Sequence, residues 1–189
     1  MRVLRRLLPA ALACLVCCAS VSCLSMCAAA QSNEVVAERV LGPQWKRISR
    51  RAGIIFAGTV MSAPQTVSRP VLQNVPQAVA NPMKTDRAVA AVELKFRVDR
   101  SITGAKKGQF LTIHEWAGAQ SRHRPMRPGQ HLLLFLYPPS RLGLTSPVGG
   151  SLGQIELDPS GENVAPVFAA KSRVPVAQLE SAIRAARGE

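Results

Sequence analysis

The stretch Ala90–Gly104 reads AAVELKFRVDRSITG and decides the fold of this 189-residue chain. Apolar and charged side chains alternate through its middle: Val92, Leu94, Phe96 and Val98 against Glu93, Lys95, Arg97 and Asp99. A period of two predicts a strand with one face on a core and the other in water. The segments around this stretch are therefore interpreted as its partners in a sheet.

Three further apolar runs predict strands around this stretch. They are Gly53–Met61, Phe110–Trp116 and His131–Tyr137, followed by two short candidate strands at Gln154–Leu157 and Val164–Ala169. Gly58, inside the first run, predicts a bulge where that strand bends. The run from His131 is the most apolar, which indicates a central strand that is covered on both faces.

Helical periodicity appears near both ends of the chain. Pro43 is a suitable first residue for a short N-terminal helix, whose core face holds Trp45, Ile48 and Ala52. Residues 175–187 predict a C-terminal helix that is capped by Gly188, and its apolar face holds Val176, Leu179 and Ile183. Between the first two strands, residues 62–86 contain four prolines and predict a long loop.

The first 30 residues have the organisation of an export signal. A basic start is followed by an uncharged run from Leu7 to Ala30 that ends in three alanines. This pattern predicts cleavage after Ala30 and leaves Gln31 as the first mature residue. The alternatives are an uncleaved membrane anchor and a lipoprotein signal ending at Cys27.

The predicted signal contains every cysteine of the chain, namely Cys14, Cys17, Cys18, Cys23 and Cys27. The mature chain therefore has no disulfide, and its stability depends on its core.

The signal holds three of the 24 basic residues and none of the 11 acidic ones, so the mature chain has a net charge of +10. Such a charge favours anionic partners, although scattered charges also serve solubility. Export and the single tyrosine disfavour nucleic acid as the partner.

Short motifs resemble one known family. They are Phe56–Val60, Phe96–Val98, Gly104, Gly108, Leu111, Ile113, Gly129 and Leu132–Phe135. This pattern resembles bacterial exported domains related to tissue inhibitors of metalloproteinases and netrin-like modules, over roughly residues 53–170. The resemblance implies an OB-fold, a five-stranded Greek-key barrel with a packed helix. The inhibitors of that family use an N-terminal cysteine to clamp the protease zinc, and a chain starting at Gln31 has none, so this mechanism does not carry over.

The three histidines form no catalytic or metal-binding motif. His114 and Glu115 are neighbours on a predicted strand, so their side chains point to opposite faces. The spacing of His114, His123 and His131 contains no short HxH or HxxxH pair, which disfavours a zinc site. Ser146 lacks the G-x-S-x-G context of a hydrolase nucleophile. The sequence therefore predicts no catalytic residue, no metal and no cofactor.

Two segments are candidates for binding. Trp116 precedes the densest basic patch, which holds Arg122, His123, Arg124 and Arg127. An aromatic ring beside clustered cations is typical of a site for an anionic partner, and the alternative is a solvated loop. The second candidate is a distinctive glycine-containing loop of unknown role with Thr145, Ser146, Pro147, Gly149 and Gly150. Its composition is equally typical of a backbone turn.

The sequence thus predicts a mainly β protein, a small OB-like Greek-key β-barrel with a short N-terminal helix and a C-terminal helix. The expected parts are a signal peptide (1–30), an N-terminal segment (31–52), the barrel (53–170) and the C-terminal helix (171–189). We expect an exported, periplasmic or extracellular, non-catalytic binding or structural module of the cell envelope. Its expected partner is a protein or an anionic envelope polymer, and only the signal meets the membrane. A secreted hydrolase or a protease-inhibitor-like protein is the alternative.

Overall fold

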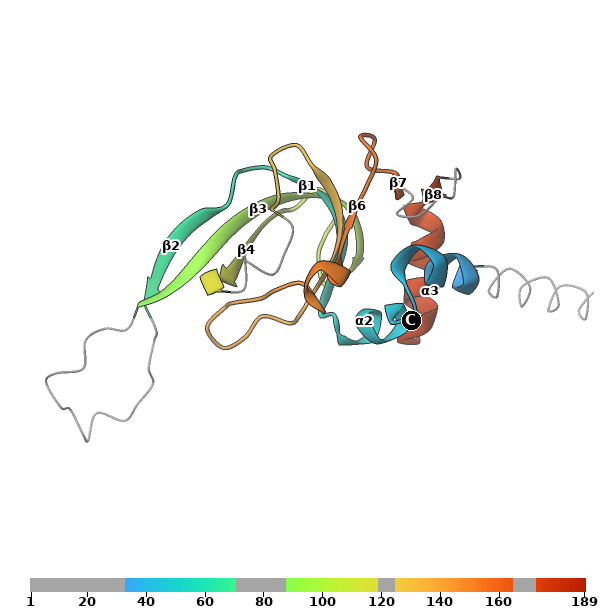
Figure 1. Cartoon of the computed structure of the whole chain (residues 1–189), viewed down its shortest axis with the longest axis horizontal. Helices are drawn as coiled ribbons and strands as arrows, with labels where there is room; N and C mark the ends of the chain where they lie inside the picture. The colour runs from blue at the N-terminus through green and yellow to red at the C-terminus, as the bar shows by residue number, and fades with distance from the viewer. Residues whose placement is uncertain (1–32, 71–87, 119–124, 165–172) are drawn as a thin grey trace, which may run out of the picture.

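A six-stranded antiparallel sheet is the main element of the computed structural model, which describes residues 33–70, 88–118, 125–164 and 173–189 (Figure 1). Its strands are β1 (Ile54–Val60), β2 (Gln65–Pro70), β3 (Ala88–Thr103), β4 (Phe110–Trp116), β5 (His131–Leu136) and β6 (Gln154–Glu156). The strand order is β2-β3-β1-β5-β6, and β4 pairs with β3. The protein is therefore mainly β, as predicted, but the sheet does not close into a barrel.

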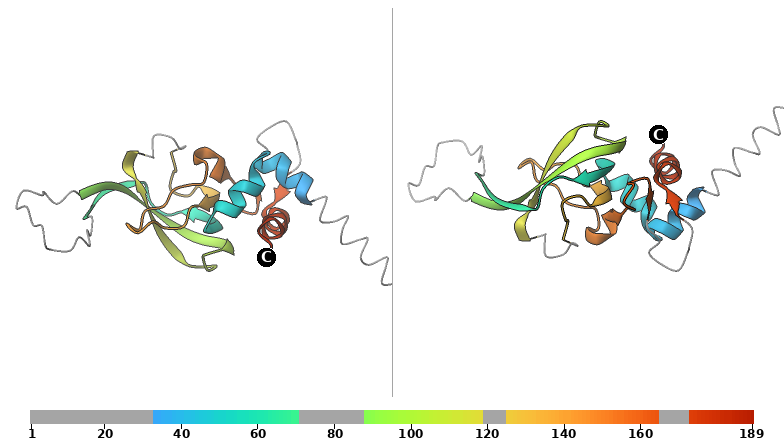
Figure 2. Two further views of the ribbon diagram at one scale, coloured as in Figure 1. Left: turned by 90° about the horizontal axis from the view of Figure 1, so that it is seen from below. Right: turned by 90° about the horizontal axis from the view of Figure 1, so that it is seen from above.

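The helices and the remaining short strands lie at the two ends of the described chain. They are a helix over residues 33–41, α2 (Trp45–Arg51), the 3-10 helix η3 (Gly150–Gly153), β7 (Asn163–Val164), β8 (Val174–Pro175) and α3 (Val176–Arg187). β7 and β8 pair with each other as a separate two-stranded sheet. In Figures 1 and 2 the helices gather at one end of the molecule, and β2 and the first half of β3 extend away from them.

Strand β3 carries three other strands. Its first residues pair with β2, its last residues pair with β1, and residues Ala91–Arg97 pair with β4. Residues 91–93 face both β2 and β4, so these two strands lie on opposite edges of β3. The stretch from Ala90 is thus confirmed as the strand that the rest of the sheet is built on.

The predicted alternation along β3 is confirmed. Its four apolar residues, Val92, Leu94, Phe96 and Val98, are all buried in one cluster with Phe56, Val60, Ile113, Met126 and the even-numbered leucines of β5. We call this cluster the inner core. The rings of Phe56 and Phe96 meet edge to face with their centroids 5.6 Å apart, a favourable aromatic geometry.

A bulge changes the phase of β3 after Val98. Gly58 pairs with Val98 but Ala57 pairs with Arg100, so Asp99 is an extra residue. The phase shift turns Ile102 to the other side of the sheet, where it packs against the helices. A Cβ on Gly58 would lie 2.5 Å from the carbonyl oxygen of Arg97, so the predicted irregularity at this glycine is confirmed.

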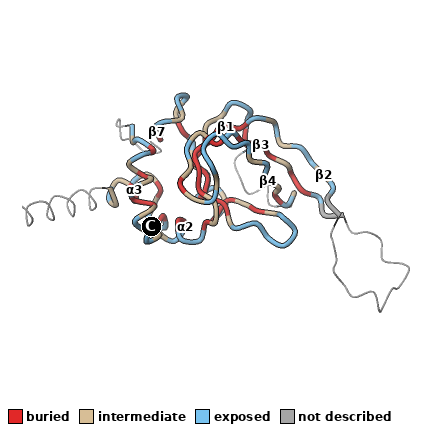
Figure 3. The backbone as a smooth tube through the Cα atoms, turned by 180° about the vertical axis from the view of Figure 1, so that it is seen from behind, coloured by how far each residue is buried: buried red, intermediate tan, exposed pale blue. Residues whose placement is uncertain are grey.

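The helices cover the opposite face of β1 and β5. Ile55 and Ala57 of β1 and Leu133 and Phe135 of β5 pack there against apolar residues of all three helices, in what we call the helix-side core. β5 has buried residues on both faces, which confirms the prediction of a central strand. In Figure 3 the buried residues gather around β1, whereas the tube is mostly exposed along β2.

The N-terminal segment holds two helices where the sequence predicted one. The first covers residues 33–41 and buries Ala37 and Leu41, and it ends at Gly42 with a positive φ of 84°. In α2 the predicted core residues Trp45 and Ile48 are buried, but Pro43 lies in the turn before this helix rather than at its first position.

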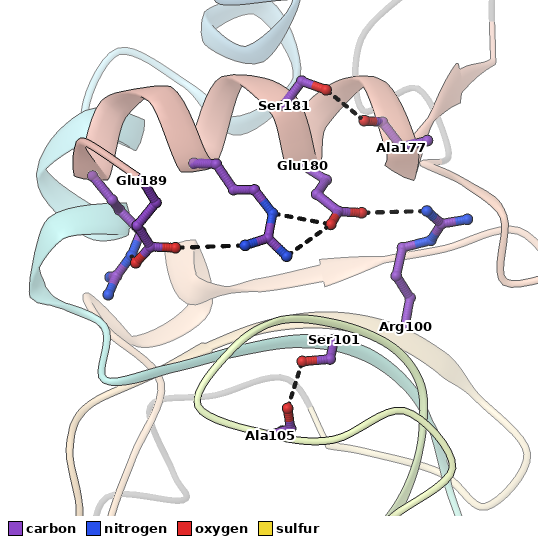
Figure 4. Close-up of polar contacts among 9 residues, drawn as sticks. Arg100, Ser101, Ala105, Ala177, Glu180, Ser181 and Glu189 are labelled. Atoms are coloured by element: carbon purple, nitrogen blue, oxygen red, sulfur yellow. Dashed lines mark hydrogen bonds and ion pairs between the residues drawn. The ribbon is translucent and has the colours of Figure 1, made fainter.

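Polar contacts fix α3 against the sheet and against α2. Glu180 accepts hydrogen bonds from Arg100 of β3 and from Arg184 of its own helix, as Figure 4 shows. Arg187 donates to the carbonyl oxygens of Ser49 and Ala52, at 2.6 and 2.8 Å, and so satisfies the end of α2. The predicted face of α3 and its Gly188 cap are both confirmed.

The predicted loop over residues 62–86 is partly wrong, because Gln65–Pro70 pair with β3 as β2. The strand lies at the edge of the sheet and reaches a proline only at its last residue, where a missing N–H donor is tolerated.

Three predicted segments lie outside the described residues. They are the signal, residues 71–87 of the predicted loop, and the last predicted strand except for Val164. No helix among the described residues is long and apolar enough to cross a membrane.

The face assignment of β3 predicts very different costs for two neighbouring substitutions. Phe96 is fully buried, so Phe96→Ala is expected to lower the free energy of unfolding by about 3–5 kcal/mol. Arg97 is exposed and paired with Asp99, so Arg97→Ala is expected to cost less than about 1 kcal/mol. Urea unfolding of both variants measures the difference, and equal losses would show that β3 is buried on both faces.

Candidate functional site

The part of the sheet away from the helices presents one surface on β3 and β4. Cross-strand pairing sets Arg97 beside Phe110, Lys95 beside Thr112, Glu93 beside His114 and Ala91 beside Trp116. We call these residues the outer face. Phe110 and Trp116 stand at its two ends, 70% and 57% exposed. A regular strand spaces them about 20 Å apart and holds them at fixed positions.

The charges of the outer face are paired with one another. Glu93 contacts Lys95 Nζ and His114 Nε2, each at 3.2 Å, and the hydrogen bond from Lys95 is the main cause of the lowered pKa of Glu93. Arg97 Nε donates to Asp99 at 2.9 Å. These pairs leave the outer face close to neutral, so a strong attraction for anions must come from residues beside it.

Strand β4 separates His114 from Glu115, as predicted. His114 lies on the outer face, while Glu115 pairs with Val92 of β3 and is only 1% exposed. The two side chains point to opposite faces and do not act on a common atom. His114 is therefore a half-buried histidine with a local hydrogen-bond partner.

The predicted basic patch is only partly described. Arg122, His123 and Arg124 lie outside the described residues. Trp116 is the last residue of β4, and Arg127 is an exposed residue four positions before β5. The backbone N–H of Arg127 donates to the side chain of Gln130, and no ion pair engages its guanidinium among the described residues. Trp116 and Arg127 are thus both available to a partner.

The distinctive loop has a structural role. The backbone N–H of Thr145 donates to the carbonyl oxygen of His114 at 2.8 Å, and its hydroxyl donates to that of Tyr137 at 2.6 Å. Pro147 forms a bridge with Leu136 of β5. The loop therefore links the end of β5 to the free edge of β4. Ser146 accepts a backbone hydrogen bond from Tyr137, and Gly149 and Gly150 adopt positive φ angles where η3 begins.

A cluster of polar side chains that the sequence did not predict lies where β1, β3 and β5 meet. Thr59 Oγ1 lies 2.6 Å from Asp99 Oδ2 and 3.1 Å from His131 Nδ1. Asp99 and His131 approach to 3.7 Å. Gly161 covers the imidazole, and a Cβ at this glycine would lie 2.9 Å from Nδ1.

The hydrogen-bond order in this cluster makes Thr59 a bridge between two side chains. A carboxylate only accepts hydrogen bonds, so the single proton of the Thr59 hydroxyl points to Asp99. With that proton directed to Asp99, the hydroxyl oxygen is the acceptor for Nδ1–H of His131. Thr59 thus connects two side chains from neighbouring strands.

The turn beside this cluster is held by a second carboxylate. Asp158 accepts hydrogen bonds from Ser160 and Asn163, and these bonds, with that of Ser160 the largest cause, hold its pKa well below the ordinary value. Among the described residues no group of three or more His, Cys, Asp or Glu side chains is placed to hold a metal ion.

The cluster predicts a specific cost for removing one hydroxyl. Thr59→Val keeps the shape of the side chain but leaves Asp99 and His131 without their shared partner, so a loss of about 1–3 kcal/mol in the free energy of unfolding is expected. Thr112→Val is the matched control, since Thr112 is exposed on the same sheet and should change stability by less than about 0.5 kcal/mol. Urea unfolding that finds equal stability for the two variants would contradict this role of Thr59.

Comparison of the chain with protein-family models, with curated proteins and with solved structures finds no match. The fold and the geometry of these side chains therefore carry the functional argument.

Proposed function

We propose that this protein is an exported, non-catalytic binding module of the cell envelope. Its contact surface is the end of the outer face at Trp116 together with the predicted basic patch of Arg122, His123, Arg124 and Arg127. The partner is an anionic polymer or an acidic protein surface of the envelope. The observation that carries the proposal is the exposure of Trp116 at the end of a regular strand that none of the described helices covers (Figure 1).

Binding energy in interfaces is concentrated in a few anchors, among which tryptophan and arginine are enriched. Trp116 is fixed by the pairing of β4 with β3, so little conformational entropy is lost when a partner covers its ring. Its cross-strand neighbour Ala91 is fully buried and small, which leaves the indole as the prominent group of this row. These features support Trp116 as the anchor.

The charge of the chain supports an anionic partner. The predicted mature chain has a net charge of +10, and the cations of the outer face are already paired. The local attraction is assigned to Arg127, whose guanidinium makes no ion pair among the described residues, together with Arg122, His123 and Arg124, which lie close to it in the sequence. A local site of this kind adds to the general field of a basic protein, and salt screens the general field first.

An OB-like architecture is the proposed class of this module. Its support is the long strand β3 shared by three others and the loop that reaches from β5 to His114 of β4. OB-folds bind extended polymers on one face, which agrees with a polymer as partner. The hydrolase alternative would use Thr59, whose hydroxyl is already occupied by its hydrogen bonds with Asp99 and His131.

Two double variants separate a local site from the general field. Trp116→Ala with Arg127→Ala removes one exposed aromatic and one cation at the proposed site. Phe110→Ala with Lys107→Ala removes the same groups at the other end of β4, where Lys107 is exposed in the turn before it. We expect the first pair to weaken affinity for heparin or for phosphatidylglycerol vesicles by about tenfold and the second pair by much less.

Retention is compared over a range of salt concentrations, after a thermal melt shows that both variants are folded. The difference between the variants should be largest at low salt and should persist in part when the Debye length falls below about 8 Å, because the contact with Trp116 is not ionic. Equal retention of the two double variants at every salt concentration would contradict the local site.

A further inference from the structure

Glu115 is a buried carboxyl group that neither the sheet nor the proposed binding surface uses. Its side chain is 1% exposed, and Oε1 has no hydrogen-bond partner. It pairs with Val92 of β3, on the face of β4 that also holds Ile113. Strand pairing therefore directs the carboxyl group to the apolar inner core.

The described residues that form the core on that side are apolar. β1 contributes Phe56 and Val60, β3 contributes Val92, Leu94, Phe96 and Val98, β4 contributes Ile113, β5 contributes Leu132, Leu134 and Leu136, and the segment before β5 contributes Met126. Among the described residues no charged side chain belongs to this core. The adjacent titratable residues Glu93 and His114 lie on the outer face and bond each other. Thr66 of β2, in the same row, is exposed, and the hydroxyl of Thr145 is used by Tyr137.

These surroundings tolerate the neutral carboxylic acid far better than the carboxylate. Burying a charge without a partner is much more costly than burying a neutral polar group. Loss of solvation on burial is the cause that raises the pKa of Glu115 to about 7. The charged form gains free energy when the carboxylate reaches water, which requires the strand to move.

We propose that Glu115 is a proton-operated latch for the end of β4. In the protonated form it lets residues 114–118 lie on the inner core, and in the ionised form it promotes their release into water. β4 is suited to local release because among the described strands it pairs with β3 alone, and Glu115 is the second-last residue of the strand. On its other edge the N–H of Thr145 donates to the carbonyl oxygen of His114, so release of this segment also breaks that hydrogen bond. The inference concerns the strand itself and does not depend on the proposed binding function.

The buried Glu115 carboxyl group determines whether the stability of the folded chain rises or falls with pH. An unfolded chain ionises Glu115 near pH 4.5, whereas the folded chain keeps its proton up to about pH 7. Between these values the folded state binds more protons, so its stability falls as the pH rises. The contribution of Glu115 is fully present below pH 4.5 and is lost above pH 7.

The test compares the purified protein with Glu115→Gln, which keeps a neutral polar group at every pH, and with Glu162→Gln as a control in an exposed turn. Urea unfolding is measured from pH 4.5 to 8.5. Over this range the unfolding constant of the unchanged protein should rise by up to about 100-fold relative to that of Glu115→Gln. Glu162→Gln should follow the unchanged protein.

Hydrogen exchange followed by mass spectrometry locates the effect. After correction for the intrinsic pH dependence of exchange, the peptide over residues 110–118 should lose protection from pH 5 to 8 more than the peptide over 131–136 does. Glu115→Gln should abolish this difference. If Glu115→Gln does not fold, Glu115→Met replaces it, with a side chain of similar length and no charge. Identical pH profiles in the unchanged protein and the variant, or a loss of protection that spares β4, would overturn the proposal.

Discussion

The pairing of β3 with three other strands is the constraint on which the rest of the structure depends. The first half of this 16-residue strand holds β2 on one edge, and its second half holds β1 on the same edge. The other edge holds β4. Because β1 in turn holds β5, every described strand of the main sheet is attached through β3, and a change in its register would displace both cores at once.

The two halves of β3 have different surroundings, since the half after the bulge packs against the helices and the charged residues of the half before it are exposed to water. Past the bulge at Asp99, β3 faces the helices, and Arg100 and Ile102 join it to α3 and to the helix-side core. Before the bulge its charged residues face water, and none of the described helices covers them (Figure 1). The described helices gather at one end of the molecule (Figures 1 and 2), and Trp116 is exposed at the end of β4.

Sequence periodicity predicted those elements whose burial repeats regularly. The alternation through Phe96, the apolar run of β5 and the face of α3 each depend on one local period, and each is confirmed. The helix at 33–41 carries Val36, Ala37, Val40 and Leu41 at helical spacing, a signal that was missed. β2 was missed because it lies between Pro64 and Pro70. Thr59 and His131 meet because β1 and β5 pair in a particular register, and a local pattern contains no information on that register. The opposite orientation of Glu115 and His114 was predicted, but the burial of Glu115 depends on the strands and loops packed over it.

The two tryptophans test the division into a covered and an uncovered half most directly. Trp45 is 2% exposed in the helix-side core, and Trp116 is 57% exposed on the outer face. Acrylamide quenching of fluorescence is measured on Trp45→Phe, which keeps only Trp116, and on Trp116→Phe, which keeps only Trp45. The account predicts strong quenching of Trp116 and weak quenching of Trp45. Equal quenching of the two, or a shielded Trp116, would contradict it.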